Sequence, residues 1–254
     1  MSFSSRSYVN RYIPSNRFPV GVRWLLIVNI GLFVFEYILK TTSSVEFFRQ
    51  NFYLMPAQVV QTFAIWQLAT YMFFHAGFGH ILWNMLALWM FGVPLERLWG
   101  TAKFLRFYFV CGICAALTVV AAAYIFGGTD VRTVGSSGAI YGILVAYGVM
   151  FPDQTILFGF LIPIKSKYFV MIIGAVVFLQ SLSATVGGQR SGVAVLAHLG
   201  GLITGYLLLR GKTLQSQIRQ PVISSYKEWK LRRARKKFEV YLRKKDSNRD
   251  RWVH

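Results

Sequence analysis

Apolar residues of this chain gather in six long blocks separated by more polar stretches. A helix needs about 20 mostly apolar residues to cross the hydrocarbon core of a bilayer, so each block is a candidate membrane span. The pattern predicts an all-α polytopic membrane protein with a bundle of six transmembrane helices. The predicted spans are Val20–Leu39, Ile81–Leu98, Phe104–Phe126, Ser137–Phe151, Tyr168–Ser183 and Gly192–Leu209.

The fourth block is short, and it begins in a Gly/Ser cluster rather than in an apolar run. Such a start is tolerated at membrane depth only where it is buried in protein or reached by water. We therefore expect neighbouring helices or a hydrated cavity around the start of this span. The chain divides into a basic segment at 1–19, a membrane domain at 20–209 and a basic tail at 210–254.

Composition agrees with a membrane protein. Hydrophobic residues form 55% of the 254 residues and charged residues 15%, whereas about a quarter of an average soluble domain is charged. The mean hydropathy is +0.46. These values exclude a disordered chain, a collagen-like repeat and an ordinary soluble enzyme, but they suit transporters and channels as well. Cys111 and Cys114 lie inside the third span, where we expect them to pack as small residues.

Lysine and arginine mark the cytoplasmic side of a membrane protein. The formal net charge is +19, and from Arg210 onward the tail contains 15 Lys/Arg and four Asp/Glu. The amino-terminal segment and the second and fourth connections are also basic, whereas the others are nearly neutral. We therefore expect both termini in the cytoplasm, with a bacterial plasma membrane as the location. The acid-free, Ser- and Arg-rich start also fits an organelle transit peptide, which stays an alternative.

Two segments outside the spans are predicted to touch the membrane surface. The first connection, about Lys40 to Gly79, is too long for a simple link. We expect it to be partly helical and to lie at the outer interface, with the aromatic residues Trp66, Tyr71, Phe73 and Phe74 embedded.

The basic tail interleaves aromatic residues with its lysines and arginines, which favours contact with anionic lipid. A plain solvated tail is the alternative. Nucleic acid is not expected as a partner, because the charge comes without a recognisable nucleic-acid-binding fold.

Strongly polar groups at membrane depth are costly, so those inside the blocks are functional candidates. Ser137 opens the fourth span within Gly135-Ser136-Ser137-Gly138, and His198 lies in the sixth span, about 10 Å below its outer end. The orientation derived from charge places both in the outer half of the membrane. The structural alternatives are a helix cap for the serine and a core histidine. Ser136 is the alternative reactive serine.

Glycine spacing predicts that the fourth and sixth spans pack together. Small residues four apart let two helices approach closely in a membrane. His198 shares a helix face with the glycines of its span, and Tyr141 lies one turn after Ser137. The glycine pairs are Gly138 and Gly142 in the fourth span, and Gly201 and Gly205 in the sixth.

A third polar group begins the second span. His80 and Asn84 are four residues apart and project from one helix face, and His75 lies just before the helix. A zinc site is the rival interpretation, but no third acidic or cysteine ligand is near, and asparagine is not a usual zinc ligand. We favour a pair of N–H donors directed at an oxygen atom, and we expect neither a metal nor a cofactor.

These groups are together the parts needed for acyl transfer. A serine beside a histidine can attack a carbonyl carbon while the imidazole takes the hydroxyl proton and returns it to the leaving amine. The negative charge that develops on the carbonyl oxygen needs donors, for which His80, Asn84 and the backbone N–H of Ser137 are candidates. Asp130 lies on the right side of the membrane, but nothing orients it toward His198. We therefore favour a Ser-His dyad.

The combination of three motifs resembles the rhomboid intramembrane serine proteases over roughly residues 66–209. The motifs are His80-x-x-x-Asn84, Gly135-x-Ser137-Gly138 and Ala197-His198-x-x-Gly201. Each fragment alone is weak, whereas the joint pattern on six spans is specific. The resemblance implies a six-transmembrane-helix rhomboid-like bundle and a hydrolase that cleaves transmembrane segments near their outer end. It also implies a water-filled active-site cavity open to the outer side.

The resemblance assigns roles to individual residues. It implies that Ser137 is the nucleophile and His198 the general base, with His80 and Asn84 as side chains of the oxyanion hole. The supporting positions that it implies are Tyr141, which stacks on the catalytic histidine, and the structural residues His75, Gly135, Gly138, Gly201 and Glu96-x-x-x-Gly100.

One departure from the family pattern lies in the first loop. Many rhomboids carry Trp-Arg where this chain has Trp66-Gln67, which bears on how the loop is anchored. Two other functions stay open alongside the protease. One is a non-catalytic rhomboid-like protein that binds transmembrane helices, and the other is a transporter, which leaves the Ser/His pairing unexplained.

Overall fold

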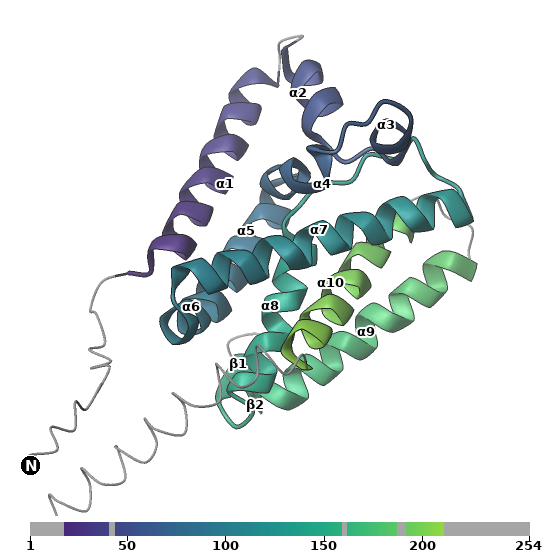
Figure 1. The fold of residues 1–254 in the computed structure, drawn as a ribbon. Helices are drawn as coiled ribbons and strands as arrows, with labels where there is room; N and C mark the ends of the chain where they lie inside the picture. Colours follow the sequence, from purple (N-terminus) through teal and green to yellow (C-terminus); the bar gives the residue numbers. More distant parts are fainter. Residues whose placement is uncertain (1–17, 41–43, 159–161, 187–191, 211–254) are drawn as a thin grey trace, which may run out of the picture. The chain divides into compact units, whose positions relative to one another are not determined.

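The computed structural model describes residues 18–40, 44–158, 162–186 and 192–210. These residues are mostly helical, and a two-stranded antiparallel sheet connects α8 to α9 (Figure 1). The elements are α1 (Val20–Leu39), α2 (Ser44–Phe52), α3 (Pro56–Gln61), α4 (Gln67–Thr70), η1 (Tyr71–Phe73), α5 (Phe78–Ala87), η2 (Leu88–Gly92), α6 (Val93–Trp99), α7 (Thr101–Phe126), α8 (Ser137–Met150), β1 (Thr155–Phe158), β2 (Ile162–Lys165), α9 (Ser166–Val186) and α10 (Gly192–Arg210).

The long apolar helices coincide with the predicted blocks, which confirms the all-α membrane class. In the part of the chain that the structure describes, four helical segments are long and apolar enough to cross a membrane, and two further apolar helices are shorter. The number of six spans stays a prediction, because the two shorter helices lack the length of a full crossing. The four are Val20–Leu39, Phe78–Trp99, Thr101–Phe126 and Ser166–Ser183, and the two are Ser137–Met150 and Val195–Arg210.

The short helix α8 is enclosed by other helices. Ten of its 14 residues are buried. It packs most extensively on α7 and also contacts α5 and α9. Ser136, at its amino-terminal end, is fully buried. A helix with protein on most sides does not need to match the thickness of the bilayer, which explains how 14 residues suffice.

The second predicted span is one continuous rod with an irregular centre. α5, the π-helical turn η2 and α6 follow one another without a break from Phe78 to Trp99. Pro94 has no backbone N–H and cannot donate to the carbonyl four residues earlier. A π turn absorbs one extra residue in a helix, and here it lies immediately before this proline. The rod can therefore direct α5 and α6 to different neighbours.

Glu96 of α6 ties α1 to the rest of the bundle. Its carboxylate oxygens accept hydrogen bonds from the backbone N–H groups of Gly21 and Val22, both at 2.7 Å. The Thr101 hydroxyl donates to the same carboxylate at 2.6 Å. The first N–H groups of a helix have no partner within it, so a distant carboxylate caps α1 here. A Cβ atom on Gly21 would lie only 3.0 Å from Glu96 Oε2.

The first loop is partly helical as predicted, but its aromatic residues are not all at the surface. Tyr71 and Phe74 are buried in the protein, whereas the side chain of Trp66 is 49% exposed. The Tyr71 hydroxyl donates to the backbone carbonyl of Gly112 in α7 at 2.8 Å. The expectation that Tyr71 and Phe74 embed in the membrane interface is therefore wrong, because a partner within the protein satisfies the tyrosine hydroxyl.

The side chain of Gln67 forms hydrogen bonds with several segments of this loop. It is fully buried. Its Oε1 accepts the backbone N–H of Met55 at 3.0 Å, and its Nε2 donates to Gln58 Oε1 at 2.6 Å and to the carbonyl of Gln50 at 3.2 Å. The residue at which this chain departs from the Trp-Arg pattern thus links α4 to α2, to α3 and to Met55 between them.

Two predicted segments fall almost entirely outside the described residues. They are the basic amino-terminal segment at 1–19 and the basic tail at 210–254. The predicted domain limits at these points stay predictions.

Candidate active site

Gly135 lies two residues before the start of α8 and forms the backbone turn there. Its φ of +116° is a conformation that side-chain-bearing residues rarely adopt. Its backbone N–H donates to the carbonyl of Tyr71 at 3.0 Å, which fixes the loop to the first connection. A Cβ atom at this position would lie 2.6 Å from Cε1 of His80. A glycine is therefore needed both for the backbone turn and for the approach of the histidine.

Ser137 and His198 meet across α8 and α10. Ser137 Oγ lies 2.8 Å from His198 Nε2, which is hydrogen-bond distance. Both side chains are partly exposed. When Nε2 carries no proton, the hydroxyl donates to it, and this is the arrangement in which the imidazole can remove the serine proton.

The ring of His198 is held by packing on one face. The centroids of the Tyr141 and His198 rings are 4.5 Å apart, with an interplanar angle of 34°. Among the residues that the structure describes, no hydrogen-bond partner lies at the buried Nδ1 of His198. Asp130 is exposed, and no hydrogen bond joins it to Nδ1 of this ring. Within the described ranges, therefore, no third group is hydrogen-bonded to the imidazole of this pair.

The glycines allow the close approach of α8 and α10. A Cβ atom on Gly201 would collide with the backbone carbonyl of Gly138, and one on Gly205 would lie 2.8 Å from the Cα of Gly142. Both expected pairs thus lie at one helix–helix contact. The backbones come this close only because neither helix has a side chain there.

A cavity of about 330 Å³ adjoins the serine and the histidine. His80 and Asn84 reach it from α5, as expected from their spacing on one helix face. The remaining lining includes Trp83, Ile140 and Tyr141. The cavity is large enough for a small part of a substrate and for water.

The hydrogen bond of His80 defines which of its nitrogens can donate. The backbone N–H of Ala76 donates to Nδ1 of His80 at 3.4 Å, so this nitrogen acts as an acceptor. In a neutral imidazole the other nitrogen then carries the proton. That Nε2 faces Gly135, because a Cβ atom there would lie 2.7 Å from it. Asn84 Nδ2 donates to the carbonyl of His80 at 2.9 Å and keeps a second N–H.

Comparison with known proteins gives a consistent picture. The family model described as "Rhomboid domain" matches residues 62–212. The chain is 30% identical to "Rhomboid protease AarA" of Providencia stuartii over 210 residues, which is 76% of this chain and 73% of that protein. The chain belongs to the rhomboid family. The resemblance on the three motifs is thereby confirmed, and the protein is an integral membrane rhomboid.

Two relatives from Bacillus subtilis match a smaller part of the chain. The chain is 34% identical to "Putative rhomboid protease YdcA" over 143 residues, covering 56% of this chain and 65% of that protein. It is 31% identical to "Rhomboid protease GluP" over 142 residues, covering 56% of this chain and 25% of that protein. The matches thus span less than two thirds of the length of these two relatives.

His75 lies behind the oxyanion candidates of this rhomboid. Its Nε2 is 3.5 Å from Ser136 Oγ, and its ring packs edge-on against His80 with centroids 5.1 Å apart. Burial, and to a lesser extent the neighbouring His80, lowers the pKa of His75 to about 3. The ring is therefore neutral at physiological pH and positions His80 without adding charge.

Sequence reasoning missed one polar cluster near the site of this rhomboid. Glu36 of α1 is 8% exposed. It accepts hydrogen bonds from Arg49 Nε at 3.1 Å and from the Tyr53 hydroxyl at 2.5 Å. Burial, together with the hydrogen bond to Glu36, raises the pKa of Tyr53, so the phenol keeps its proton and donates it. The signal was present in the sequence, since Glu36 is an acid inside an apolar block.

Proposed function

We propose that this rhomboid is an intramembrane serine endopeptidase that hydrolyses peptide bonds of transmembrane substrates near the outer face of the membrane. The observation that supports it best is the 2.8 Å distance between Ser137 Oγ and His198 Nε2 at a cavity lined by two N–H-bearing side chains. The names of the relatives agree with a protease.

The first step is attack by the serine. Ser137 Oγ forms a bond to the carbonyl carbon of the substrate, and its proton passes to His198 Nε2. The carbonyl π electrons move to the oxygen, which becomes an oxyanion. Nε2–H of His80, the second N–H of Asn84 and the backbone N–H of Ser137 are the proposed donors to that oxygen. Helix α8 begins at Ser137, so its partial positive end also favours the negative charge.

The second step releases the amine, and water completes the reaction. The oxyanion collapses, the C–N bond breaks, and the imidazolium of His198 gives its proton to the leaving nitrogen. Water then attacks the acyl-enzyme while His198 takes its proton, and Ser137 leaves as a hydroxyl when that proton returns. Tyr141 limits rotation of the imidazole during both transfers.

Inactivation of the dyad tests the proposal directly. Purified protein in detergent is incubated with a single-span model substrate. Ser137→Ala and His198→Ala are each expected to reduce cleavage by at least about 10⁴-fold, as loss of a serine-protease nucleophile or base does. Ser44→Ala, on the exposed start of α2, is the matched control and should cleave like the unsubstituted chain. Substantial cleavage by either dyad variant would reject the mechanism.

The alternative function is a non-catalytic rhomboid-like protein that binds transmembrane helices. It predicts binding of the model substrate without cleavage and without labelling by a serine-reactive fluorophosphonate. The protease predicts labelling that Ser137→Ala abolishes. The buried face of α8 and the Ser/His contact favour the protease, because a binding protein has no need of a hydroxyl held at hydrogen-bond distance from an imidazole.

We further propose that both termini are cytoplasmic and that the basic tail contacts anionic lipid there. Positive charge on alternate connections supports the orientation, and the 15 basic residues from Arg210 onward support the lipid contact. Cysteine labelling with a membrane-impermeant reagent tests the orientation. A cysteine introduced at exposed Asp130 should react from outside the cell, whereas one at exposed Asp153 should not.

A further inference from the structure

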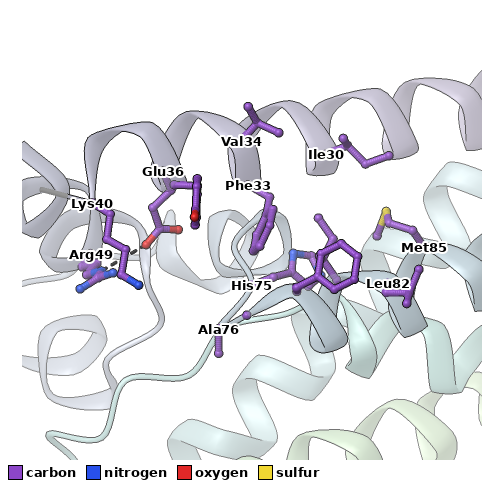
Figure 2. A pocket seen from close by; sticks show the side chains of 14 residues that line it. Ile30, Phe33, Val34, Glu36, Lys40, Arg49, His75, Ala76, Leu82 and Met85 are labelled. Atoms are coloured by element: carbon purple, nitrogen blue, oxygen red, sulfur yellow. Dashed lines mark hydrogen bonds and ion pairs between the residues drawn. The ribbon is translucent and has the colours of Figure 1, made fainter.

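A second pocket lies between α1 and α5, apart from the cavity at Ser137. Its volume is about 750 Å³, within the range of small-molecule sites. Figure 2 shows side chains of both helices facing it, with Phe33 extending from α1 toward His75. Most of its wall is apolar, formed by Ile30, Phe33 and Val34 of α1 and by Ile81, Leu82 and Met85 of α5.

The position of the pocket in the membrane follows from the length of α1. A helix of 20 residues is about 30 Å long, which matches the hydrocarbon core of a bilayer. Lys40, directly after the helix, then lies at the level of the lipid headgroups, and Ile30 lies near the midplane. The pocket runs between these two residues, over about 15 Å along α1. It therefore has the depth of one leaflet.

The headgroup end of the pocket is positively charged. Lys40 and Arg49 both line this part of the pocket (Figure 2). Arg49 is paired through Nε with Glu36, so these two charges compensate each other. Lys40 makes no ion pair with any residue that the structure describes, which leaves one positive charge at the mouth. The guanidinium of Arg49 retains further N–H groups that Glu36 does not use.

We propose that this pocket binds one phospholipid with an anionic headgroup. An acyl chain lies against the apolar wall, and the phosphate lies beside Lys40 with Arg49 as a second donor. A phospholipid matches both parts of the pocket, because its acyl chain needs an apolar wall one leaflet deep and its phosphate needs a positive group at the mouth. The charge at the mouth selects an anionic over a zwitterionic headgroup.

The bound chain would also lie close to the candidate active site. His75 belongs to the wall of this pocket, and its ring contacts His80 on the other side. An occupant is thus one side chain away from a proposed oxyanion donor. Any effect on cleavage rests on the proposed function, whereas the binding of lipid does not.

Native mass spectrometry of the purified full-length protein tests the binding. The protein is titrated with phosphatidylglycerol and, separately, with phosphatidylcholine. Lys40→Gln is expected to weaken phosphatidylglycerol binding about fivefold, which corresponds to about 1 kcal/mol for one basic residue. It should leave phosphatidylcholine unchanged. Leu82→Trp fills the apolar part and is expected to reduce the binding of both lipids.

Two matched variants control for charge and for bulk. Lys103→Gln removes an exposed lysine of α7, and Leu179→Trp adds the same ring to an exposed position of α9. Both should bind the lipids like the unsubstituted chain, and the basic tail is identical in all variants. If Lys40→Gln and Leu82→Trp match these controls, the pocket holds no lipid and the proposal fails. Displacement of phosphatidylglycerol by a transmembrane peptide or by a second copy of the chain would also overturn it.

Discussion

The imidazole of His198 depends on its neighbours for orientation more than for charge. No carboxylate reaches its Nδ1 within the described residues, so the ring of Tyr141 is the main contact that limits its rotation. In a protease with an Asp-His-Ser triad the aspartate has this role. In the proposed dyad the tilted ring of Tyr141 provides this orientation, and no carboxylate of the described residues bonds to Nδ1 to raise the basicity of the imidazole.

Two substitutions of Tyr141 distinguish the effect of its ring packing from the effect of its hydroxyl group. Tyr141→Phe keeps the ring and is expected to retain kcat within about twofold. Tyr141→Ala removes a contact of about 0.5–1.5 kcal/mol and should lower kcat by up to about tenfold with little change in KM. Steady-state cleavage of a fluorogenic transmembrane peptide measures both constants. An equal loss in the two variants would assign the role to the hydroxyl instead.

Protonation of His75 makes folding sensitive to acid. Its pKa in the folded protein is about 3, below the ordinary value of 6.5, because burial disfavours the charged ring. The unfolded chain takes up a proton below pH 6.5 while the folded chain does not. Stability is therefore fully present above pH 6.5 and falls as the pH drops from there toward about 3. The loss between pH 6.5 and 5 is about 2 kcal/mol for this one group.

Unfolding in detergent at several pH values measures this effect. In His75→Gln the unfolding free energy should depend less steeply on pH, by the equivalent of about one proton taken up on unfolding. This difference does not depend on the absolute stability of the variant. An unchanged pH dependence would show that the ring is protonated in the folded state. The difference between the two slopes is the relevant quantity, because other titratable groups are the same in both proteins.

The contact between α8 and α10 leaves no room for an added side-chain atom at Gly201. Gly201→Ala places a methyl group on the backbone carbonyl of Gly138, which cannot move aside as a flexible side chain could. We expect a loss of at least about 2 kcal/mol in unfolding free energy, with cleavage reduced in parallel. Thermal unfolding followed by circular dichroism gives the shift.

Gly174→Ala is the matched control for this substitution. Gly174 lies in α9, and nothing is within 4 Å of the position of an added Cβ atom. Alanine favours a helix over glycine by about 0.5–1 kcal/mol, so this variant should be at least as stable as the unsubstituted chain. If Gly201→Ala behaves like Gly174→Ala, then the two helices are not held together at this point.

Elements differ in how well the sequence predicts them. Apolar blocks gave α1 with its observed limits, and glycine spacing placed α8 against α10. The hairpin of β1 and β2 was not predicted, because this connection was interpreted only through its charges, although Gly159 between two short apolar runs is a turn signal. The burial of α8 was also beyond the sequence, since a helix that is apolar all round suits both a lipid-exposed and a protein-enclosed position.

Residues of the site could be predicted where polarity stands out from an apolar background. Ser137, His198, His80 and Asn84 all lie in or beside apolar blocks, and the structure brings them to one cavity. Gln67 could not be predicted, because a glutamine in a polar loop normally faces water. Its burial depends on backbone groups of the same loop that become available only after folding.

At the scale of the whole molecule, α1 lies outside the region that the rhomboid family model matches, residues 62–212. Glu96, inside that region, provides a hydrogen-bonded link to it. Glu96→Ala leaves two backbone N–H groups of α1 without their acceptor, at a cost of about 1–3 kcal/mol each. We expect a lower midpoint of unfolding and easier proteolysis between α1 and α5.

Glu96→Gln is the informative comparison. Its amide oxygen can still accept one of the two N–H groups, so its stability should lie between those of the unsubstituted chain and Glu96→Ala. Limited proteolysis followed by mass spectrometry locates the cleavage. A Glu96→Ala protein that resists proteolysis as well as the unsubstituted chain would mean that packing alone retains α1.

The π turn at Leu88–Gly92 sets the angular phase between two halves of one rod. Each residue of a regular helix advances the next by about 100°. A π turn takes up one extra residue without that advance, so a regular helix of the same length would rotate His80 and Asn84 by about 100° relative to Glu96. Such a helix would leave Glu96 facing α1 and swing the two donors away from Ser137. The irregular turn between these motifs is thus as much a part of the candidate catalytic machinery as the side chains themselves.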